Sequence, residues 1–82
     1  MIAITLKLFA VYQDALGCPE MTMELPEKTT VGELCDRICS QYPDLKKWQG
    51  LTRFGVNLQF VSADTLLNDG DEVVLIPPVS GG

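Results

Sequence analysis

Apolar and polar residues alternate at the start of the chain, and the pattern returns further along. Over residues 2–8 the apolar positions are Ile2, Ile4, Leu6 and Leu8. A period of two, with β-branched residues, predicts a strand that buries one face. A second alternating run over residues 21–25 predicts another strand, and residues 11–16 are expected to form a short helical turn closed by Gly17. The two strands are therefore expected to pair as an antiparallel hairpin with a wide loop.

The pattern then changes to a helical period. Thr30 and Glu33 stand three apart, the spacing of a capping box, in which each side chain binds the other residue's backbone amide. Apolar residues at helical spacing follow and predict an amphipathic helix over 31–41. Residues 43–52 are expected to be irregular, with Trp48 covering one end of the core or, as the alternative, contacting a partner.

Two further strands are predicted before the end of the chain. Alternation over residues 54–60 indicates a third strand. Asn57 within it could fix a turn or bulge or could bond a partner, and we expect the structural role. The nearly continuous apolar run over 72–76 is typical of a central strand buried on both faces. Pro77 and Pro78 cannot donate to a strand ladder, so the sheet should end there.

The order of elements, two strands, a helix and two strands, indicates an α+β fold. Right-handed crossover through the helix places the last strand beside the first and parallel to it. The expected result is a mixed sheet with one main helix across one face, which is the β-grasp architecture of ubiquitin. We expect this domain to span residues 1–76 and residues 77–82 to form an extended, flexible tail.

Composition limits the possible chemistry. The chain has 82 residues, too few for two domains with a cleft between them. Six Lys and Arg stand against eleven Asp and Glu, and the net charge of −5 argues against a nucleic-acid-binding surface. The absence of histidine removes Ser-His-Asp and Cys-His catalysis. No apolar run is long enough to span a membrane.

The three cysteines give no sign of a disulfide framework. Cys18, Cys35 and Cys39 are odd in number, and two thiols without further ligands make a poor zinc site. We expect them to be small core residues, with no bound metal, in a cytoplasmic protein.

The end of the chain carries a specific resemblance. Residues 68–82 read N-D-G-D-E-V-V-L-I-P-P-V-S-G-G. With Leu8-Phe9-Ala10, Ala15-Leu16-Gly17, Val56-Asn57 and Phe60-Val61, this pattern resembles the small, sulfur-carrying subunits of molybdopterin synthase, the MoaD family. The resemblance covers essentially the whole chain, and a terminal Gly-Gly after Pro-Pro and a D-G-D-E strand start is far more specific than Gly-Gly alone.

The resemblance implies a sulfur carrier that acts only with partners and is not an enzyme alone. The carboxylate of Gly82 would be adenylated with ATP by an adenylyltransferase similar to the ubiquitin-activating class. A persulfide donor would then supply sulfur for a Gly82 thiocarboxylate. In the large synthase subunit, within a heterotetramer, this sulfur would go to cyclic pyranopterin monophosphate to build the molybdopterin dithiolene. Gly81 and Gly82 lack a Cβ, which suits entry into a narrow channel. No cofactor would be bound by the carrier itself.

Side chains alternate between the two faces of a strand, and this alternation together with the resemblance suggests how such a carrier docks. Phe9, Phe60 and Ile76 are expected to form an exposed apolar patch beside the tail, although all three could instead be core residues. The expected partner-binding set is completed by the tail residues Pro77, Pro78, Val79 and Ser80.

Three other functions remain open on the sequence. The chain could carry sulfur for another pathway, such as thiamine thiazole formation, although carriers for thiamine usually lack Pro-Pro before the tail. It could be a ubiquitin-like modifier whose Gly82 forms isopeptide bonds. It could also be a β-grasp binding module with an inert tail.

Overall fold

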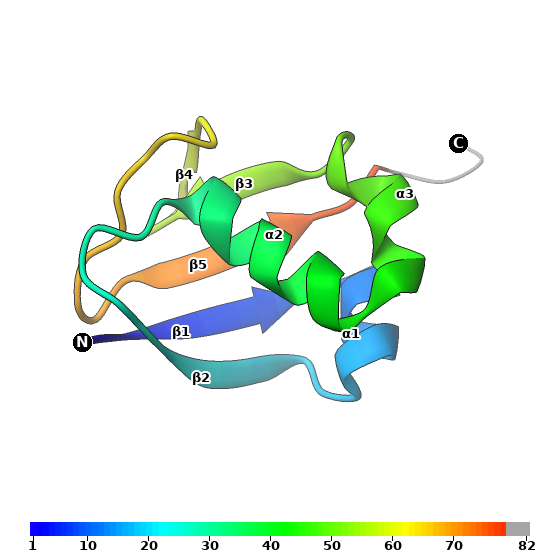
Figure 1. The fold of residues 1–82 in the computed structure, drawn as a ribbon, viewed down its shortest axis with the longest axis horizontal. Coiled ribbons are helices and arrows are strands. Elements are labelled where there is room, and N and C mark those ends of the chain that lie inside the picture. The colour runs from blue at the N-terminus through cyan, green and yellow to red at the C-terminus, as the bar shows by residue number, and fades with distance from the viewer. Residues whose placement is uncertain (79–82) are drawn as a thin grey trace.

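A mixed sheet and a helix that crosses it make up residues 1–78, which are the residues that the computed structural model describes (Figure 1). The elements in chain order are β1 Ile2–Leu8, α1 Ala10–Leu16, β2 Glu20–Leu25, α2 Val31–Gln41, the 3-10 turn η1 Pro43–Leu45, α3 Lys46–Gln49, β3 Arg53–Val56, β4 Gln59–Val61 and β5 Glu72–Ile76. The predicted helix over 31–41 and the last strand over 72–76 are confirmed with these bounds.

The sheet has the topology predicted from the order of elements. Within residues 1–78 it contains five strands in the order β2-β1-β5-β3-β4. β1 pairs antiparallel with β2, with Ile4 opposite Met23, and parallel with β5, with Leu6 opposite Val73. The first and last strands therefore lie side by side at the centre, and the α+β, β-grasp prediction is confirmed.

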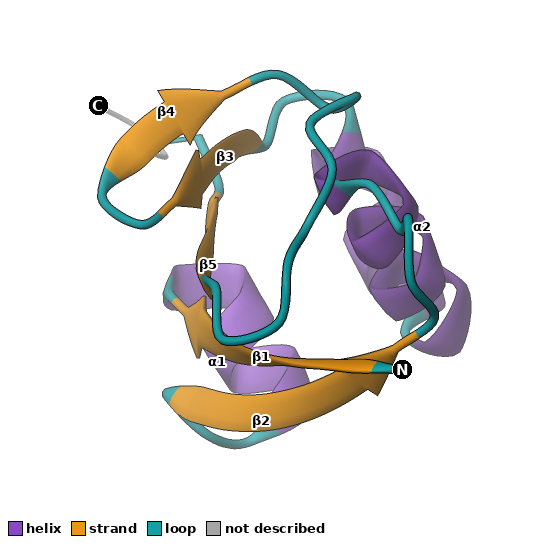
Figure 2. Ribbon diagram, turned by 90° about the vertical axis from the view of Figure 1, so that its left-hand side faces the viewer, coloured by secondary structure: helices purple, strands orange, loops and turns teal. Residues whose placement is uncertain are grey.

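Helix α2 begins at the predicted capping box and covers one face of the sheet. The Thr30 hydroxyl accepts a hydrogen bond from the Glu33 backbone amide at 3.1 Å, and the Glu33 carboxylate accepts one from the Thr30 amide at 3.3 Å. Two donors that a helix start would leave unpaired are thus satisfied. The sheet curls around α2, as Figure 2 shows.

The core lies between this helix and the sheet. Its fully buried side chains come from the inward positions of the strands and from both longer helices: Ile4, Leu6, Leu8, Tyr12, Leu25, Val31, Leu34, Cys35, Ile38, Cys39, Val73 and Leu75. In β5, Val74 and Ile76 are only half-buried, so the prediction that this strand is buried on both faces is wrong. The reason is that α1, through Tyr12, packs on the same face as α2, which leaves the outer face without a helix within the described chain.

The single strand predicted over 54–60 is also wrong. This segment is a hairpin of β3 and β4, in which Phe54 pairs with Val61 and Gly55 with Phe60. The turn is formed by Asn57 and Leu58, whose φ angles are 50° and 70°. Two consecutive positive φ angles are those of the tight turn that matches strand twist in a two-residue hairpin.

The segment over 43–52 is more regular than predicted. It folds as η1 and α3, and Leu45 at the end of η1 is buried. Trp48 is partly buried against the core, as predicted for its anchoring role. The short helix α1 ends at Gly17 in the left-handed conformation, with φ at 78°, which confirms the predicted helical turn and its glycine cap.

The cysteines agree with a packing role. Cys35 and Cys39 are buried and Cys18 is half-buried, and all three thiols are free.

Among residues 1–78, no helix combines the length and the apolar character that crossing a bilayer requires.

Candidate docking face and chain exit

The outer face of the sheet is divided into an apolar half and a charged half. One row of paired residues crosses all the strands: Phe60, Gly55, Val74, Lys7 and Glu20. Directly paired residues point to the same face. Leu6 and Val73, the neighbours of this row, point into the core, so the row itself faces outward.

The apolar half contains a shallow hollow of about 180 Å³, lined by Gly55, Leu58, Gln59, Phe60, Val74 and Ile76. Phe60 is 74% exposed at its rim. Gly55 forms part of the floor, where an added Cβ would lie 3.6 Å from the Cβ of Val74. The missing side chain at Gly55 therefore leaves room beside Phe60 for an apolar group from another molecule. We call this region the apolar face.

A second hollow of about 340 Å³ lies where the chain leaves the sheet, and we call it the exit hollow. It is lined by Phe9, Ala10, Val11, Trp48, Ile76, Pro77 and Pro78. Ile76 lines both hollows, so the two regions form one continuous surface. Pro77 is buried and Pro78 half-buried, so the last two residues that the structure describes still pack against the domain.

The structure thus brings together part of the predicted binding set. Phe9 is 49% exposed and lies in the exit hollow, whereas Phe60 lies on the apolar face. Ile76, which is half-buried, connects them. The alternative that all three are core residues fails for Phe9 and Phe60. Val79, Ser80, Gly81 and Gly82 lie outside the described residues.

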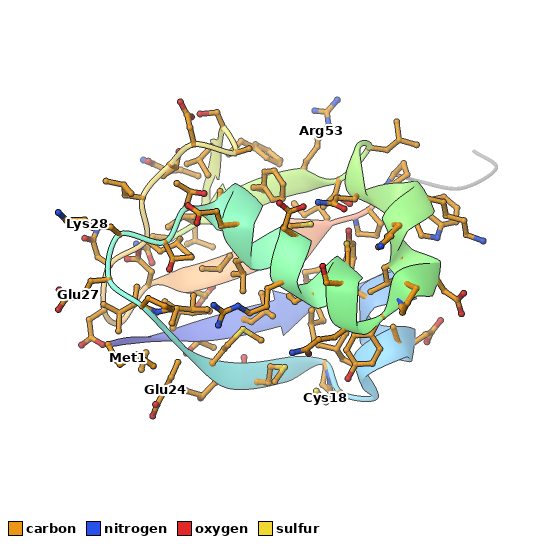
Figure 3. The ribbon with its side chains drawn as sticks, in the orientation of Figure 1. Met1, Cys18, Glu24, Glu27, Lys28 and Arg53 are labelled. Carbon is orange, nitrogen blue, oxygen red and sulfur yellow. The ribbon has the colours of Figure 1, made fainter. Side chains whose placement is uncertain are left out.

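The charged half of the outer face lies on β1 and β2. Lys7 Nζ lies 3.4 Å from Glu72 Oε1, and both side chains are more than one third exposed, so this ion pair adds little stability. Glu20 and Glu24 are exposed on β2, and Figure 3 shows Glu24 at the lower edge of the sheet. The Lys7–Glu72 pair therefore separates the apolar face from the acidic side chains of β2, and a partner that reaches beyond this pair would meet them with a basic rim.

Polar side chains fix the β3–β4 hairpin to the start of β5. Asn57 Nδ2 donates to Asp71 Oδ1 at 2.9 Å, and Asn57 Oδ1 accepts from the Glu72 amide at 3.0 Å. Asp71, only 8% exposed, also accepts from the Asn68 amide at 2.8 Å. The structural role predicted for Asn57 is confirmed, since these bonds hold the hairpin that carries Phe60.

The D-G-D-E sequence has a structural explanation in the same region. Asp69 Oδ1 accepts a hydrogen bond from the Ala3 amide at 2.8 Å, and the Gly70 amide donates to the Ala3 carbonyl at 2.8 Å. Gly70 has a φ of 85°, which glycine adopts without steric cost. The motif therefore sets the register of β5 between β1 and the hairpin.

Leu58 is a surface residue that the sequence analysis missed. It is 90% exposed at the hairpin tip and lines the apolar face, although a positive φ disfavours a γ-branched side chain. The available signal was Asn57, a residue that tolerates the left-handed region, directly before it. A turn assigned at Asn57 would have placed Leu58 outside any strand.

A chain of buried polar groups lies behind the exit hollow. Tyr12 Oη lies 2.6 Å from Thr52 Oγ1 and 3.7 Å from Cys35 Sγ. Burial raises the pKa of the Tyr12 hydroxyl well above its usual range, and burial also raises the pKa of the Cys35 thiol to about 12. Both groups are therefore neutral near pH 7, and neither is an activated nucleophile.

A wider hollow lies elsewhere on the described chain. It measures about 740 Å³ and lies between α2, α3 and the loop after β4, with the charged side chains of Glu33, Asp36, Lys46 and Asp64 at its rim and the buried Cys35 and Thr52 also in its lining. It shares no lining residue with the apolar face or the exit hollow. Within residues 1–78, no three side chains of the metal-ligating types gather into a cation site.

Solved structures with the same fold are similar over nearly the whole chain. A putative molybdopterin converting factor subunit 1 from Pyrococcus furiosus superposes with a TM-score of 0.81 at 30% identity, covering 96% of this chain and 100% of that one. The small archaeal modifier protein 1 from Methanosarcina acetivorans gives a TM-score of 0.74 at 27% identity, covering 100% and 98%.

Sequence comparison gives the family. The ThiS family model matches residues 6–82. The molybdopterin synthase sulfur carrier subunit of Mycobacterium tuberculosis is 34% identical over 83 residues, and the match covers 100% of both proteins. The chain therefore belongs to the ThiS family, together with the sulfur carrier subunits of molybdopterin synthase.

Proposed function

We propose that this chain is the sulfur carrier subunit of a molybdopterin synthase and that its reactive group is the terminal carboxylate of Gly82. The observation that carries the proposal is the continuity of the apolar face with the exit hollow through Ile76. A partner that binds this surface is also placed next to the departing tail. The full-length similarity to the carrier from Mycobacterium tuberculosis supports the same function.

The chemistry begins with activation of the carboxylate. A free carboxylate resists nucleophilic attack because its leaving group would be oxide. An adenylyltransferase of the ubiquitin-activating kind would join Gly82 to the AMP part of ATP and release pyrophosphate. The resulting mixed anhydride has AMP as a good leaving group. Gly81 and Gly82 present no Cβ, so the acyl carbon is open to attack.

Sulfur would enter from a persulfide donor. The outer sulfur attacks the acyl carbon, AMP leaves, and an acyl disulfide forms between Gly82 and the donor. Attack by a thiol on the donor's sulfur breaks the S–S bond, leaving a Gly82 thiocarboxylate and a disulfide on the donor side. A thiocarboxylate is ionised at neutral pH and nucleophilic, so the lack of histidine in the chain is no obstacle.

The large synthase subunit would supply the rest of the active site. The four residues after Pro78 extend at most about 14 Å, which lets the thiocarboxylate enter a pocket of a partner docked on the apolar face. There the sulfur would pass to cyclic pyranopterin monophosphate, and two such transfers would complete the dithiolene. We expect the assembly to be a heterotetramer in the cytoplasm, where ATP is available.

A second candidate is a protein modifier, favoured by the similarity to a small archaeal modifier protein. Activation would be the same, but the acceptor of the Gly82 acyl group would be a lysine amine. A sulfur carrier for another pathway, such as thiamine thiazole formation, also stays possible in this family and differs only in the final acceptor.

Reconstitution with purified partners tests the proposal. Deletion of Gly82, or addition of one residue after it, should abolish molybdopterin formation while the melting temperature stays unchanged. A truncated carrier that still supports turnover would contradict the proposal. Isopeptide-linked adducts in place of molybdopterin would favour the modifier.

A further inference from the structure

The hydrogen bonds between the buried hydroxyl groups behind the exit hollow all donate in the same direction, toward Trp48. Thr52 Oγ1 donates to the Trp48 carbonyl at 2.8 Å. The single hydroxyl proton of Thr52 is used in that bond, so at 2.6 Å Tyr12 must donate to Thr52. The Cys35 thiol can then donate to Tyr12. The chain of bonds therefore runs from α2 through α1 to the last turn of α3.

This series of hydrogen bonds ends at Trp48, which forms one wall of the exit hollow. Trp48 lines that hollow together with Phe9 and Pro77. Helix α3 is only four residues long and has no side-chain cap at its start, so its own hydrogen bonds hold it weakly. Gln49 of α3 donates to Asp36 of α2 at the surface, and the bond from Thr52 to the Trp48 carbonyl, anchored by the fully buried Tyr12, ties α3 to the core.

We propose that Tyr12 and Thr52 are positioning residues that hold Trp48 as a fixed wall of the exit hollow and so aim the chain after Pro78 at the active site of the partner. This proposal rests on the proposed function. In the sulfur-transfer reaction the apolar face would bind the partner protein, whereas the wall at Trp48 would orient the terminal carboxylate. Orientation errors of about 1 Å can slow a reaction by about a hundredfold.

Thr52 offers a matched pair of variants. Thr52→Val has nearly the same shape but loses both hydrogen bonds, whereas Thr52→Ser keeps the hydroxyl. Thr52 lines neither the apolar face nor the exit hollow, and its side-chain bond to the Trp48 carbonyl is its direct link to the exit hollow. Phe60→Glu serves as the opposite control because it alters the apolar face and leaves the hydroxyl chain intact.

Trp48 is the only tryptophan of the chain, so tryptophan fluorescence measures how accessible this wall is to solvent when no partner is present. In Thr52→Val we expect greater quenching of Trp48 by acrylamide at a temperature where circular dichroism shows a folded protein. Thr52→Ser should match the wild type. Equal quenching in all three proteins would overturn the proposal, and this readout does not depend on the carrier function.

Kinetics of adenylation by the activating enzyme, with the carrier as the varied substrate, give the second readout. We expect Thr52→Val to lower kcat about tenfold and to leave KM within about twofold of the wild type, with Thr52→Ser normal. Phe60→Glu should raise KM instead. An unchanged kcat in Thr52→Val, or a rise in KM alone, would overturn the proposal. If wild-type carrier is not adenylated at all, the proposed function fails, while the fluorescence result still tests the wall.

Discussion

Asn57 is hydrogen-bonded through its side-chain amide to Asp71, with Nδ2 and Oδ1 2.9 Å apart. These residues are fourteen positions apart, and their bond joins the tip of the β3–β4 hairpin to the start of the central strand β5. The hairpin carries Phe60 and β5 carries Ile76. The geometry of the apolar face therefore depends on a polar pair that is not part of it.

Substitutions at Asn57 should separate the hydrogen bonds from the backbone conformation. Asn57→Gly loses the side-chain bonds but keeps access to a φ of 50°, and it should lower the free energy of unfolding by about 1–2 kcal/mol. Asn57→Ala should lower it by about 1 kcal/mol more, because alanine disfavours the left-handed region. Urea unfolding measures both differences. Wild-type stability in Asn57→Gly would show that the bond to Asp71 is unimportant.

At the neighbouring Leu58, stability and binding should respond differently. Leu58→Gly removes a side chain that is 90% exposed and relieves a φ of 70°. The free energy of unfolding should stay equal or rise by up to about 1 kcal/mol. Affinity for the large synthase subunit, measured by calorimetry, should fall about fivefold or more, since an interface side chain costs roughly 1 kcal/mol when truncated. Unchanged affinity would exclude Leu58 from the interface.

Phe60→Glu tests the apolar face most simply. Phe60 is 74% exposed, so the melting temperature should change by no more than about 2 °C. Binding to the large subunit should weaken by about a hundredfold, because a charge would be buried in an apolar contact. Ile76→Glu should weaken binding too, but with a clear loss of stability, since Ile76 is half-buried. Full binding by Phe60→Glu would place the interface elsewhere.

High pH should destabilise the fold through two buried groups. The pKa of Cys35 is raised from 9.0 to about 12, and the pKa of Tyr12 is raised above its usual value of 10.0, both chiefly by burial. Above about pH 9–10 the unfolded chain loses these protons while the folded protein keeps them. The stability they contribute is thus complete below pH 9 and is lost as the pH rises toward 12. Each group adds a slope of up to about 1.4 kcal/mol per pH unit.

Unfolding by urea at pH 8, 9, 10 and 11 measures this loss. The variants Tyr12→Phe and Cys35→Ala should each show a shallower decline than the wild type. A wild-type stability that is constant between pH 9 and 11 would contradict the burial of these groups.

Local sequence signals predicted most of the fold. The alternation from Ile2 to Leu8 placed the inward face of β1, and Thr30 with Glu33 placed the start of α2, because each signal depends on residues close together in sequence. The order of the sheet followed from the handedness of the crossover.

The errors have physical causes as well. Phe54, Val56, Leu58 and Phe60 alternate as in one strand, but Gly55 pairs with Phe60 and Phe54 with Val61, so Phe60 lies on the face opposite Phe54 and the apparent period of two does not follow one face. Asn57-Leu58 lacks the glycine that usually marks such a turn. The bonds of Tyr12 to Thr52 and of Asn57 to Asp71 join residues 40 and 14 positions apart, and no local pattern indicates them. Of the candidate site, the exposure of Phe9 and Phe60 was predicted, but Leu58 and the role of Thr52 required the structure.

The most direct test of the central claim is the intact mass of the carrier after incubation with ATP, an activating enzyme and a persulfide donor. Exchange of one oxygen for sulfur at the Gly82 carboxylate should raise the mass by about 16 Da. The gain should be absent without ATP and absent when Gly82 is deleted. An unchanged mass for the wild-type chain under conditions in which the activating enzyme is active on another carrier would contradict the account.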